Sequence, residues 1–367
     1  MKKGYFISFG DSIKNNDGVH KKIIAQINAF NDCNLNCYEY PLFNKMGPIY
    51  KLKWRLPIFN VAPLWKIDDR LLTADYIYFR RPLFFNSHSI AFLKTIKKQN
   101  PQCVIVLEIP TYPYDSEYDD YKFSWLVKKS DQKNRRKLKH YVDRIVTVTD
   151  DEKIFGIQTI CINNGIDLDA IQPRQFIPEN DTINICAVAQ FKYWHGYERF
   201  IRGLSNYYKY GGDRRIVCHF VGDGNELINY IKLVESLDLK DRFVFHGFLD
   251  SDELLDIYNH ASLAIGTLGM YKKNLYYSCD LKSREALARG IPLVIGCKTQ
   301  LYDENYKYFI EFPNDDSDLN IQSIIDFHDR IYSEESGNIV TDNIRRFGEK
   351  HVDIRVCMEP VIDYLQA

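Results

Sequence analysis

Short apolar runs that each lead into a turn and then into a helical pattern recur through the second half of this chain of 367 residues. The runs occupy residues 183–189, 216–221, 243–247 and 262–266. Runs of this length are typical of strands that are buried on both faces, and their alternation with helices predicts a parallel sheet. Because ligands of such sheets gather at the carboxyl ends of the strands, the turns after these runs are candidate binding sites. Helical spacing follows the first three runs, at Phe200, Ile201 and Leu204, at Leu227, Ile231 and Leu233, and at Leu254, Leu255 and Tyr258.

The most specific segment runs from residue 280 to residue 294. Its pattern predicts a helix that begins near Leu281 and ends at Gly290, followed by a buried strand at residues 293–295. Lys282 and Glu285 lie three positions apart and share a face of this helix. A phosphate group suits Lys282 and the free amides of the helix start, and a ribose diol suits the Glu285 carboxylate. For this segment alone, an ordinary helix with an exposed ion-pair face is the alternative.

The first half of the chain shows the same alternation of apolar runs and helical patterns. Strands are predicted at residues 4–10, 76–79, 104–107 and 144–148. A helix before residue 31 is expected to place Ile23, Ile24, Ile27 and Phe30 on one side. A chain of this length is too long for one comfortable core, so two α/β domains are expected.

Composition indicates the cellular compartment in which the protein is expected. No run of eighteen apolar residues and no export signal is visible in a chain with 45% hydrophobic residues. The nine cysteines are scattered singly, and Cys33 and Cys37 lack partners at metal-ligand spacing. We therefore expect a soluble cytoplasmic protein with reduced thiols.

The order of motifs resembles the GT-B glycosyltransferases, most closely glycosyltransferase family 4 or group 1, including bacterial capsule and exopolysaccharide transferases. The motifs are the turn at residues 221–224, the pair His246 and Gly247, and the segment from Glu285 to Pro292. The resemblance implies two Rossmann-like α/β domains whose parallel sheets face a central cleft. Residues 1–168 would form the acceptor domain and residues 169–348 the nucleotide-sugar domain, with a last helix at about 349–367 crossing back to the first domain.

The resemblance also assigns donor contacts. Glu285 should bind the donor ribose, and Gly222 and Gly224 should let the backbone approach the nucleotide. Further donor contacts are expected from Gln190, Tyr277, Ser278, Cys279, Leu281 and Arg284.

This sequence departs from the family pattern at three donor positions. Tyr277 stands where the family has a second glutamate, and Gln190 and His195 stand where it has an arginine and a lysine that neutralise the diphosphate. Lys192, Lys282 and Arg284 are the candidate replacements for that charge, with His195 contributing if phosphates raise its pKa. A packed loop corner is the alternative reading of His195. We take Lys282, His195 and Lys192 as the candidate catalytic residues.

Acceptor contacts are expected in the first domain. By resemblance, Asp17, Gly18 and His20 lie near the acceptor, although a polar helix cap is the alternative for Asp17. Polar and aromatic residues at the carboxyl ends of two predicted strands suit the faces and hydroxyls of a sugar, unless the prolines among them mark a rigid loop without a ligand. These residues are Arg80, Glu108, Tyr112 and Asp115.

No cofactor or metal is expected. Asp167 and Asp169 resemble the metal-binding aspartate pair of a different glycosyltransferase fold, but here they follow a turn that closes the first domain. GT-B enzymes generally neutralise the diphosphate with protein groups. The nucleotide sugar would therefore be a co-substrate without a metal ion.

Charge is unevenly distributed along the chain. Residues 1–170 contain 26 Lys and Arg against 19 Asp and Glu, and the remainder contains 22 against 30. The basic excess concentrates between Lys128 and Lys139, directly after Trp125, and tryptophan also stands beside cations at residues 51–55 and 64–66. Such clusters attract anionic lipid head groups, which predicts peripheral contact with the inner face of the cell membrane, whereas a solvated helix face is the alternative. No nucleic-acid-binding module is visible.

The sequence thus predicts an enzyme that moves a sugar from a nucleotide diphosphate to a carbohydrate acceptor, expected to be a polyprenyl-diphosphate-linked oligosaccharide in surface polysaccharide synthesis. Retention of configuration is implied by the family alone. Two alternatives stay open: a non-catalytic partner of another transferase and a GT-B nucleotide-sugar epimerase. An oxidoreductase of the dinucleotide-binding type is disfavoured, because no G-x-G-x-x-G follows the first strand.

Overall fold

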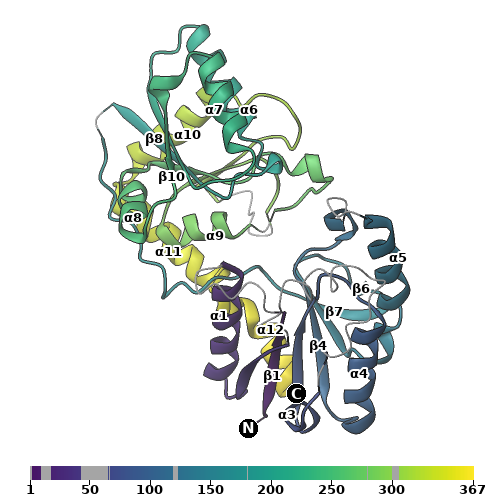
Figure 1. The fold of residues 1–367 in the computed structure, drawn as a ribbon. Coiled ribbons are helices and arrows are strands. Elements are labelled where there is room, and N and C mark those ends of the chain that lie inside the picture. The colour runs from purple at the N-terminus through teal and green to yellow at the C-terminus, as the bar shows by residue number, and fades with distance from the viewer. Residues whose placement is uncertain are drawn as a thin grey trace. The chain divides into compact units, whose positions relative to one another are not determined.

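The computed structural model describes residues 2–9, 18–42, 65, 67–118, 123–179, 181–278, 280–299 and 306–367. Contacts divide the chain into two units, residues 1–163 with 354–367, and residues 164–353. The boundary expected from the sequence, residue 168, lies five residues inside the second unit, and the returning helix starts at Ile354 where about 349 was expected. Each unit is built around its own sheet (Figure 1).

The N-terminal unit contains a seven-stranded sheet in the order β2-β1-β3-β4-β5-β7-β6. All neighbouring strands pair in parallel except β6 and β7, which are antiparallel. The strands are β1 Gly4–Ser8, β2 Cys37–Pro41, β3 Tyr76–Arg80, β4 Val104–Ile109, β5 Arg144–Thr147, β6 Lys153–Ile154 and β7 Ile157–Cys161. The helices are α1 Gly18–Asp32, α3 Asp69–Leu72, α4 Ser87–Gln99, α5 Ser124–Arg135 and α12 Ile354–Gln366, with short 3-10 turns η2 Asp115–Tyr118 and η3 Leu138–His140.

Helices cover both faces of this sheet (Figure 1). On β1, Tyr5 and Ile7 join one apolar cluster, whereas Phe6 between them joins another. On β3, Ile77 and Phe79 alternate in the same way with Tyr76 and Tyr78. Because successive strand residues point to opposite faces, runs without polar residues are what a sheet buried on both sides requires.

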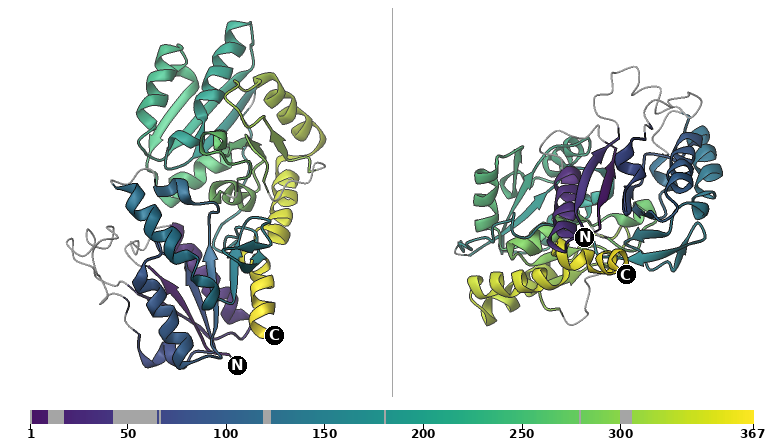
Figure 2. Two further views of the ribbon diagram at one scale, coloured as in Figure 1. Left: turned by 90° about the vertical axis from the view of Figure 1, so that its right-hand side faces the viewer. Right: turned by 90° about the horizontal axis from the view of Figure 1, so that it is seen from below.

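The last helix belongs to the N-terminal unit. Residues of α12, including Ile354 and Met358, pack with α1 against Phe6 and the rings of Tyr76 and Tyr78. The two ends of the chain lie side by side, since Lys2 Nζ donates to the Leu365 carbonyl at 2.7 Å (Figure 2).

One predicted core position of α1 is wrong. Ile23, Ile27 and Phe30 are buried, but Ile24 is 37% exposed. The three buried residues already fill the stripe that faces α12 and the sheet, and Ile24 lies one helical step, about 100°, from Ile23.

The C-terminal unit contains a six-stranded sheet, entirely parallel, in the order β10-β9-β8-β11-β12-β13. The prediction of two α/β domains with parallel sheets is confirmed, with the antiparallel β6–β7 pair as the one departure in the described residues. The strands are β8 Thr182–Val188, β9 Arg215–Val221, β10 Phe243–Gly247, β11 Leu263–Ile265, β12 Leu293–Ile295 and β13 Phe309–Glu311. The helices are α6 Tyr197–Lys209, α7 Leu227–Ser236, α8 Ser251–His260, α9 Leu281–Arg289, α10 Ile321–Glu334 and α11 Gly337–His351, with 3-10 turns η4 Tyr193–His195, η5 Lys240–Arg242 and η6 Met270–Lys273.

Helix α9 ends as its sequence predicts. Gly290 adopts φ +77°, in the left-handed region that glycine accepts most easily, and its amide closes the last turn. A Cβ at Gly290 would lie 2.5 Å from Thr341 Cγ2 of α11, so the absence of a side chain also permits the packing of α9 on α11. None of the helices within the described ranges is long and apolar enough to cross a lipid bilayer.

Replacing Gly290 by alanine should lower the free energy of unfolding of the C-terminal unit by about 2–4 kcal/mol, because the change adds left-handed strain to a clash with Thr341. Urea denaturation followed by circular dichroism measures this loss.

Gly348 provides the matched control within α11. A Cβ there would meet Val352 at 3.5 Å, an ordinary contact, so Gly348→Ala should stabilise the helix by about 0.5–1 kcal/mol. Equal effects of the two alanines would contradict the role given to Gly290.

Candidate functional site

The start of α9 is fixed by Asp280, which caps the helix. Its side chain accepts a hydrogen bond from the Ser283 amide at 2.7 Å, and the Ser278 hydroxyl donates to it at 2.8 Å. Burial alone would raise the pKa of Asp280, but the Lys282 ammonium and the Ser283 hydrogen bonds hold this pKa well below its ordinary value. The helix therefore begins with a permanent negative charge on its cap and further amides at its first turn.

Lys282 lies two positions after that cap, in the first turn of α9, and this half-buried residue holds a desolvated ammonium group there. Its Nζ donates to Thr267 Oγ1 at 3.2 Å and lies 5.9 Å from the centre of the Tyr197 ring. Burial lowers the pKa of Lys282 to about 8, although Asp280 opposes the shift. A buried ammonium without a carboxylate in direct contact is costly, so an anion brought to Lys282 would be stabilised by it.

His195 lies in the loop after β8, within the 3-10 turn η4. Its Nδ1 accepts from the Lys192 amide at 3.3 Å, and its carbonyl accepts from the Leu268 amide at 2.8 Å. Burial, together with Lys282 and Lys192, lowers the pKa of His195 to about 3. His195 is therefore neutral in the unliganded protein, and the contacts are those of a packed loop corner. Its expected contribution of positive charge would require a ligand to reverse this shift.

Two loops meet backbone to backbone beside this corner. Gly196 has φ +67°, and a Cβ there would lie 2.6 Å from the Gly269 amide nitrogen. The loop after β8 thus contacts the loop after β11, which carries Thr267. Only residues without side chains allow this approach.

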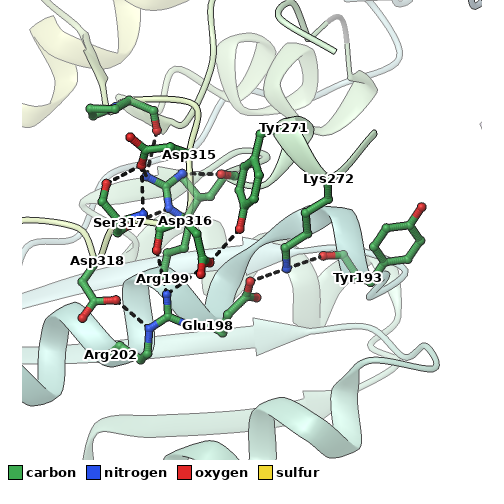
Figure 3. A network of polar contacts seen from close by, with 12 residues as sticks. Tyr193, Glu198, Arg199, Arg202, Tyr271, Lys272, Asp315, Asp316, Ser317 and Asp318 are labelled. Carbon is green, nitrogen blue, oxygen red and sulfur yellow. Dashed lines mark hydrogen bonds and ion pairs between the residues drawn. The ribbon is translucent and has the colours of Figure 1, made fainter. Parts of the chain in front are cut away.

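Arg199 on α6 holds the same loops in place (Figure 3). Its guanidinium is fully buried and donates to three backbone carbonyls, those of Leu268, Pro313 and Ser317. Around it, Arg202 binds Asp318, Tyr271 donates to Asp316 at 2.8 Å, and Lys272 pairs with Glu198. The network links α6 to the loop after β11 and to the loop after β13.

Glu285 lies on the next turn of α9. Its Oε1 is 3.4 Å from Arg289 Nη2, and its side chain is 33% exposed. Its proximity contributes to the raised pKa of Tyr258, after burial. Its partners are Arg289, at this long distance, and the Tyr258 hydroxyl, and a carboxylate with these two partners retains lone pairs for further hydroxyl donors.

Arg284 has a different hydrogen-bond partner from Lys282. It is almost fully buried, and Nη1 donates to Thr299 Oγ1 at 3.2 Å, while Nε and Nη2 have no hydrogen-bond partner among the residues that the structure describes. It lines a cavity of about 10 Å³, room for one water molecule, with Ser278, Ser283 and Thr299. Thr267 lines the same cavity, but its hydroxyl accepts from Lys282, whereas Arg284 donates to Thr299.

The glycine turn after β9 has a structural function inside the unit. Gly222 and Gly224 adopt φ +118° and +153°, and a Cβ on either would overlap the carbonyl of Ala189 or Phe191. These glycines let the turn approach the loop after β8. At the neighbouring β10 end, His219 Nδ1 lies 3.0 Å from His246 Nε2, and burial lowers the pKa of both rings.

The other predicted donor residues flank this site. Gln190 is exposed at the end of β8, Lys192 is half-buried, and Leu281 is the first residue of α9. Tyr277 is exposed and pairs with Lys298 through a single β-bridge. Cys279 lies outside the described residues.

A second polar site lies at the carboxyl ends of the strands in the N-terminal unit. Glu108, nearly fully buried, pairs with Arg80 at 3.0 Å and with Lys22 at 3.7 Å, and Gln26 Nε2 donates to it at 3.1 Å. Burial would raise the pKa of Glu108, but Arg80 and Lys22 outweigh it and lower the pKa. Glu108 is thus bound by several side chains of the protein itself. Of its two cationic partners, Arg80, whose side chain is 16% exposed, is more accessible than Lys22.

The predicted acceptor residues separate into two groups. His20 lies near Glu39, with Nδ1 4.0 Å from Oε1, beside the Ser8 hydroxyl that donates to the same carboxylate. Tyr112 instead packs on Tyr114 and Phe155, and Asp115 accepts from Arg135 at 3.0 Å. Gly18 begins α1, and Asp17 lies outside the described residues.

The basic segment around α5 is exposed. Trp125 is 61% exposed, and Lys129, Lys133, Arg136, Lys137 and Lys139 are exposed. The expectation for Trp65 is wrong: it is 7% exposed, because its ring packs against Phe9, Phe79 and Phe92. Residues 51–55, 64 and 66 lie outside the described residues.

Within the described ranges, no group of three or more His, Cys, Asp or Glu side chains is arranged to hold a metal ion. The sequence did not predict three residues that are important in these sites, namely Thr267, Arg199 and Lys22. Thr267 and Lys22 have ordinary local contexts. Arg199 follows Gly196 by three positions next to buried Phe200, which is the only local hint of its burial.

Residues 169–300 match the family model described as glycosyl transferases group 1. This match spans β8 to β12 and includes α9. A search of curated proteins found no match to this chain.

Several solved structures share the fold over the whole chain. Anabaena Alr3699/HepE in complex with UDP has a TM-score of 0.65 and 13% identity, with 100% of both chains covered. Sucrose-phosphate synthase from Thermosynechococcus elongatus has a TM-score of 0.63 and 14% identity, covering 100% of this chain and 99% of that one. The lipopolysaccharide outer core galactosyltransferase WaaB, in its apo form, has a TM-score of 0.59 and 13% identity, with 100% of both chains covered. The predicted GT-B fold is confirmed.

Proposed function

This chain carries a group 1 glycosyltransferase domain on a GT-B fold, and we propose that it transfers a sugar from a nucleoside diphosphate to a carbohydrate acceptor. The observation that carries the proposal is the start of α9, where the buried Lys282 ammonium, the first-turn amides and the Glu285 carboxylate occupy one helix end. A diphosphate needs the first two, and a ribose needs the third.

Uracil is the base that the comparisons favour. Structures of Alr3699/HepE hold UDP, UDP-glucose, or UDP with glucose. We therefore take UDP as the first probe for this chain. On the basis of the family resemblance, we also propose a polyprenyl-diphosphate-linked acceptor and retention of configuration.

Stabilisation of the departing diphosphate would supply much of the catalysis. In our proposal, Lys282 and the amides of the first turn of α9 bind the leaving group without a metal ion. Thr267 orients Lys282 through the 3.2 Å hydrogen bond, and Arg199 holds the loop that carries Thr267. Lys192 and His195 lie beside this site, and the added phosphate charge would raise the pKa of His195 from its low value.

Replacing Glu285 by alanine should weaken UDP binding by roughly 1.5–3 kcal/mol, or about 10- to 150-fold, because a charged acceptor of the ribose hydroxyls is lost. Calorimetry with UDP and with 2′,3′-dideoxy-UDP measures the effect. The native protein should prefer UDP, and Glu285→Ala should bind both nucleotides equally.

Glu349 is the matched control for this test. It forms a similar pair on α11, 3.5 Å from Arg345, and is more exposed. Glu349→Ala should leave UDP affinity unchanged. A preference for UDP that survives Glu285→Ala would contradict the ribose assignment.

The titration of Lys282 predicts how UDP affinity depends on pH. Because the pKa of Lys282 is about 8 in the free protein, the group is charged below pH 8, and binding there needs no proton at Lys282. Above pH 8, binding must take up a proton, so Kd should rise by up to about tenfold per pH unit. Calorimetry in buffers of different ionisation enthalpy should show uptake approaching one proton per UDP at pH 9.

Lys282→Met should remove this proton uptake and weaken UDP binding at pH 7. Lys232→Met, at an exposed position of α7, should preserve both the affinity and the pH profile. An unchanged profile in Lys282→Met would assign the phosphate to other groups.

We further propose that α5 and the residues after it contact an anionic membrane surface, which would suit a lipid-linked acceptor. The exposed Trp125 stands beside five exposed cations, and each cation near such a surface contributes about 1 kcal/mol. A solvated basic surface is the competing explanation.

Flotation with vesicles distinguishes these explanations. The protein should bind vesicles containing phosphatidylglycerol and not vesicles of phosphatidylcholine, and binding should weaken with salt. Lys133→Gln with Lys137→Gln should reduce the partition coefficient by about 30-fold, the equivalent of two cations. Equal binding to both vesicle types would contradict the electrostatic contact.

A further inference from the structure

A groove of about 570 Å³ lies in the C-terminal unit between the end of α6 and the start of α10. We name it the α6–α10 groove; its walls are residues 203–213 and residues 318–322. At its base a Cβ on Gly203 would overlap the Leu319 carbonyl, so the two walls meet backbone to backbone. Its volume is within the range of small-molecule binding sites.

One wall presents an aromatic ring. Tyr210, the residue that ends α6, is 83% exposed. Beside it, the Tyr207 hydroxyl accepts from the Arg214 amide at 3.1 Å, and its ring packs against Tyr208 and fixes the following turn. A single exposed tyrosine is ordinary in a soluble protein. Here, however, the ring borders a polar concave surface.

The groove offers hydrogen-bond donors and acceptors together. Asp318 accepts from Asn206 Nδ2 at 2.9 Å and from Arg202 Nε at 2.6 Å, which fixes the amide and the carboxylate at one end (Figure 3 shows Asp318 and Arg202). Asp213 and Gln322 are exposed on the two walls. The start of α10 adds first-turn amides as donors. A hydroxyl group, which both donates and accepts, matches such a surface.

Charge and polarity exclude other ligand classes. The lining residues include two aspartates and no Lys or Arg, so phosphates, nucleic acids and anionic lipids are disfavoured. The aliphatic residues of the lining, Leu319 and Ile321, are buried, so no apolar stripe is available to an amphipathic helix. The ligand class that remains is a neutral polyol with apolar C–H faces.

We propose that the α6–α10 groove binds a neutral oligosaccharide, with one sugar stacked on Tyr210 and its hydroxyls bound by Asp213, Asn206 and Gln322. The chemistry of this ligand is argued from the groove alone; its role as part of a substrate or product chain rests on the proposed function. A second carbohydrate site on a transferase raises the local concentration of the glycan being extended.

Ligand-observed NMR tests the proposal on the full chain. The probes are neutral hexasaccharides, namely maltohexaose, cellohexaose and a β-1,3-linked glucohexaose, with hexagalacturonate and inorganic phosphate as charged probes. At least one neutral hexasaccharide should bind in the millimolar range, and the charged probes should not. Tyr210→Ala should weaken this binding by about tenfold, whereas Tyr210→Phe should retain it.

Phe248 is the matched control, because it is 82% exposed in the same unit and does not line the groove. Phe248→Ala should leave hexasaccharide binding unchanged. Absence of binding by every neutral probe, equal binding by Tyr210→Ala, or displacement of the sugar by UDP would each overturn the groove assignment. UDP affinity, measured on the same samples, tests the nucleotide site separately, so its loss would count against the proposed function and not against the groove.

Discussion

The buried guanidinium of Arg199 is the interaction on which the candidate site of the C-terminal unit depends. Three backbone carbonyls from the loops after β11 and β13 converge on it, with Asp315 3.6 Å away. Burying a charge is tolerable only when hydrogen bonds replace its water, and here the replacement comes from chain segments that would otherwise be separate loops. The Gly196 and Gly269 contact brings the loop after β8 into the same assembly. Arg199 thus fixes Thr267, and Thr267 fixes the Lys282 ammonium.

This arrangement prepares the site before any ligand arrives. Lys282 is desolvated and hydrogen-bonded to a neutral hydroxyl, so its charge is under-compensated in the free protein. The nearby Asp280 is committed to the Ser283 amide and the Ser278 hydroxyl. Electrostatic stabilisation is strongest where dipoles and charges are held in place in advance and water is excluded. The network around Arg199 provides that rigidity.

Local patterns were sufficient for most of the strands and insufficient for the contacts among elements. Nine of the thirteen strands in the described residues follow from apolar runs, and the end of α9 follows from Gly290, because each signal is carried by neighbours in sequence; β2, β6, β7 and β13, which lie at or near the sheet edges, were not predicted. Arg199 gave no such signal, since the carbonyls of Leu268 and Pro313 that it binds lie 69 and 114 residues away. Thr267 gave none either, because its partner Lys282 lies 15 residues away on another element. Gly222 and Gly224 were predicted to let the backbone approach a nucleotide, which stays a prediction, and the constraint that the structure places on them is the backbone of Ala189 and Phe191. Trp65 could not be distinguished from a surface tryptophan, because the aromatic side chains that bury it are distant in sequence.

The neutral state of His195 and the charged state of Lys282 depend on each other electrostatically. Burial disfavours the charged form of both groups, and each positive charge would repel the other. The protein resolves the conflict by keeping the imidazole uncharged and engaged with the Lys192 amide, while the ammonium retains a proton up to about pH 8. A diphosphate placed at the start of α9 would reverse the repulsion, because its negative charge favours protonation of both groups. In the function we propose, a histidine at this position would therefore be neutral in the empty site, where its charge would be costly, and would gain charge only when the diphosphate binds.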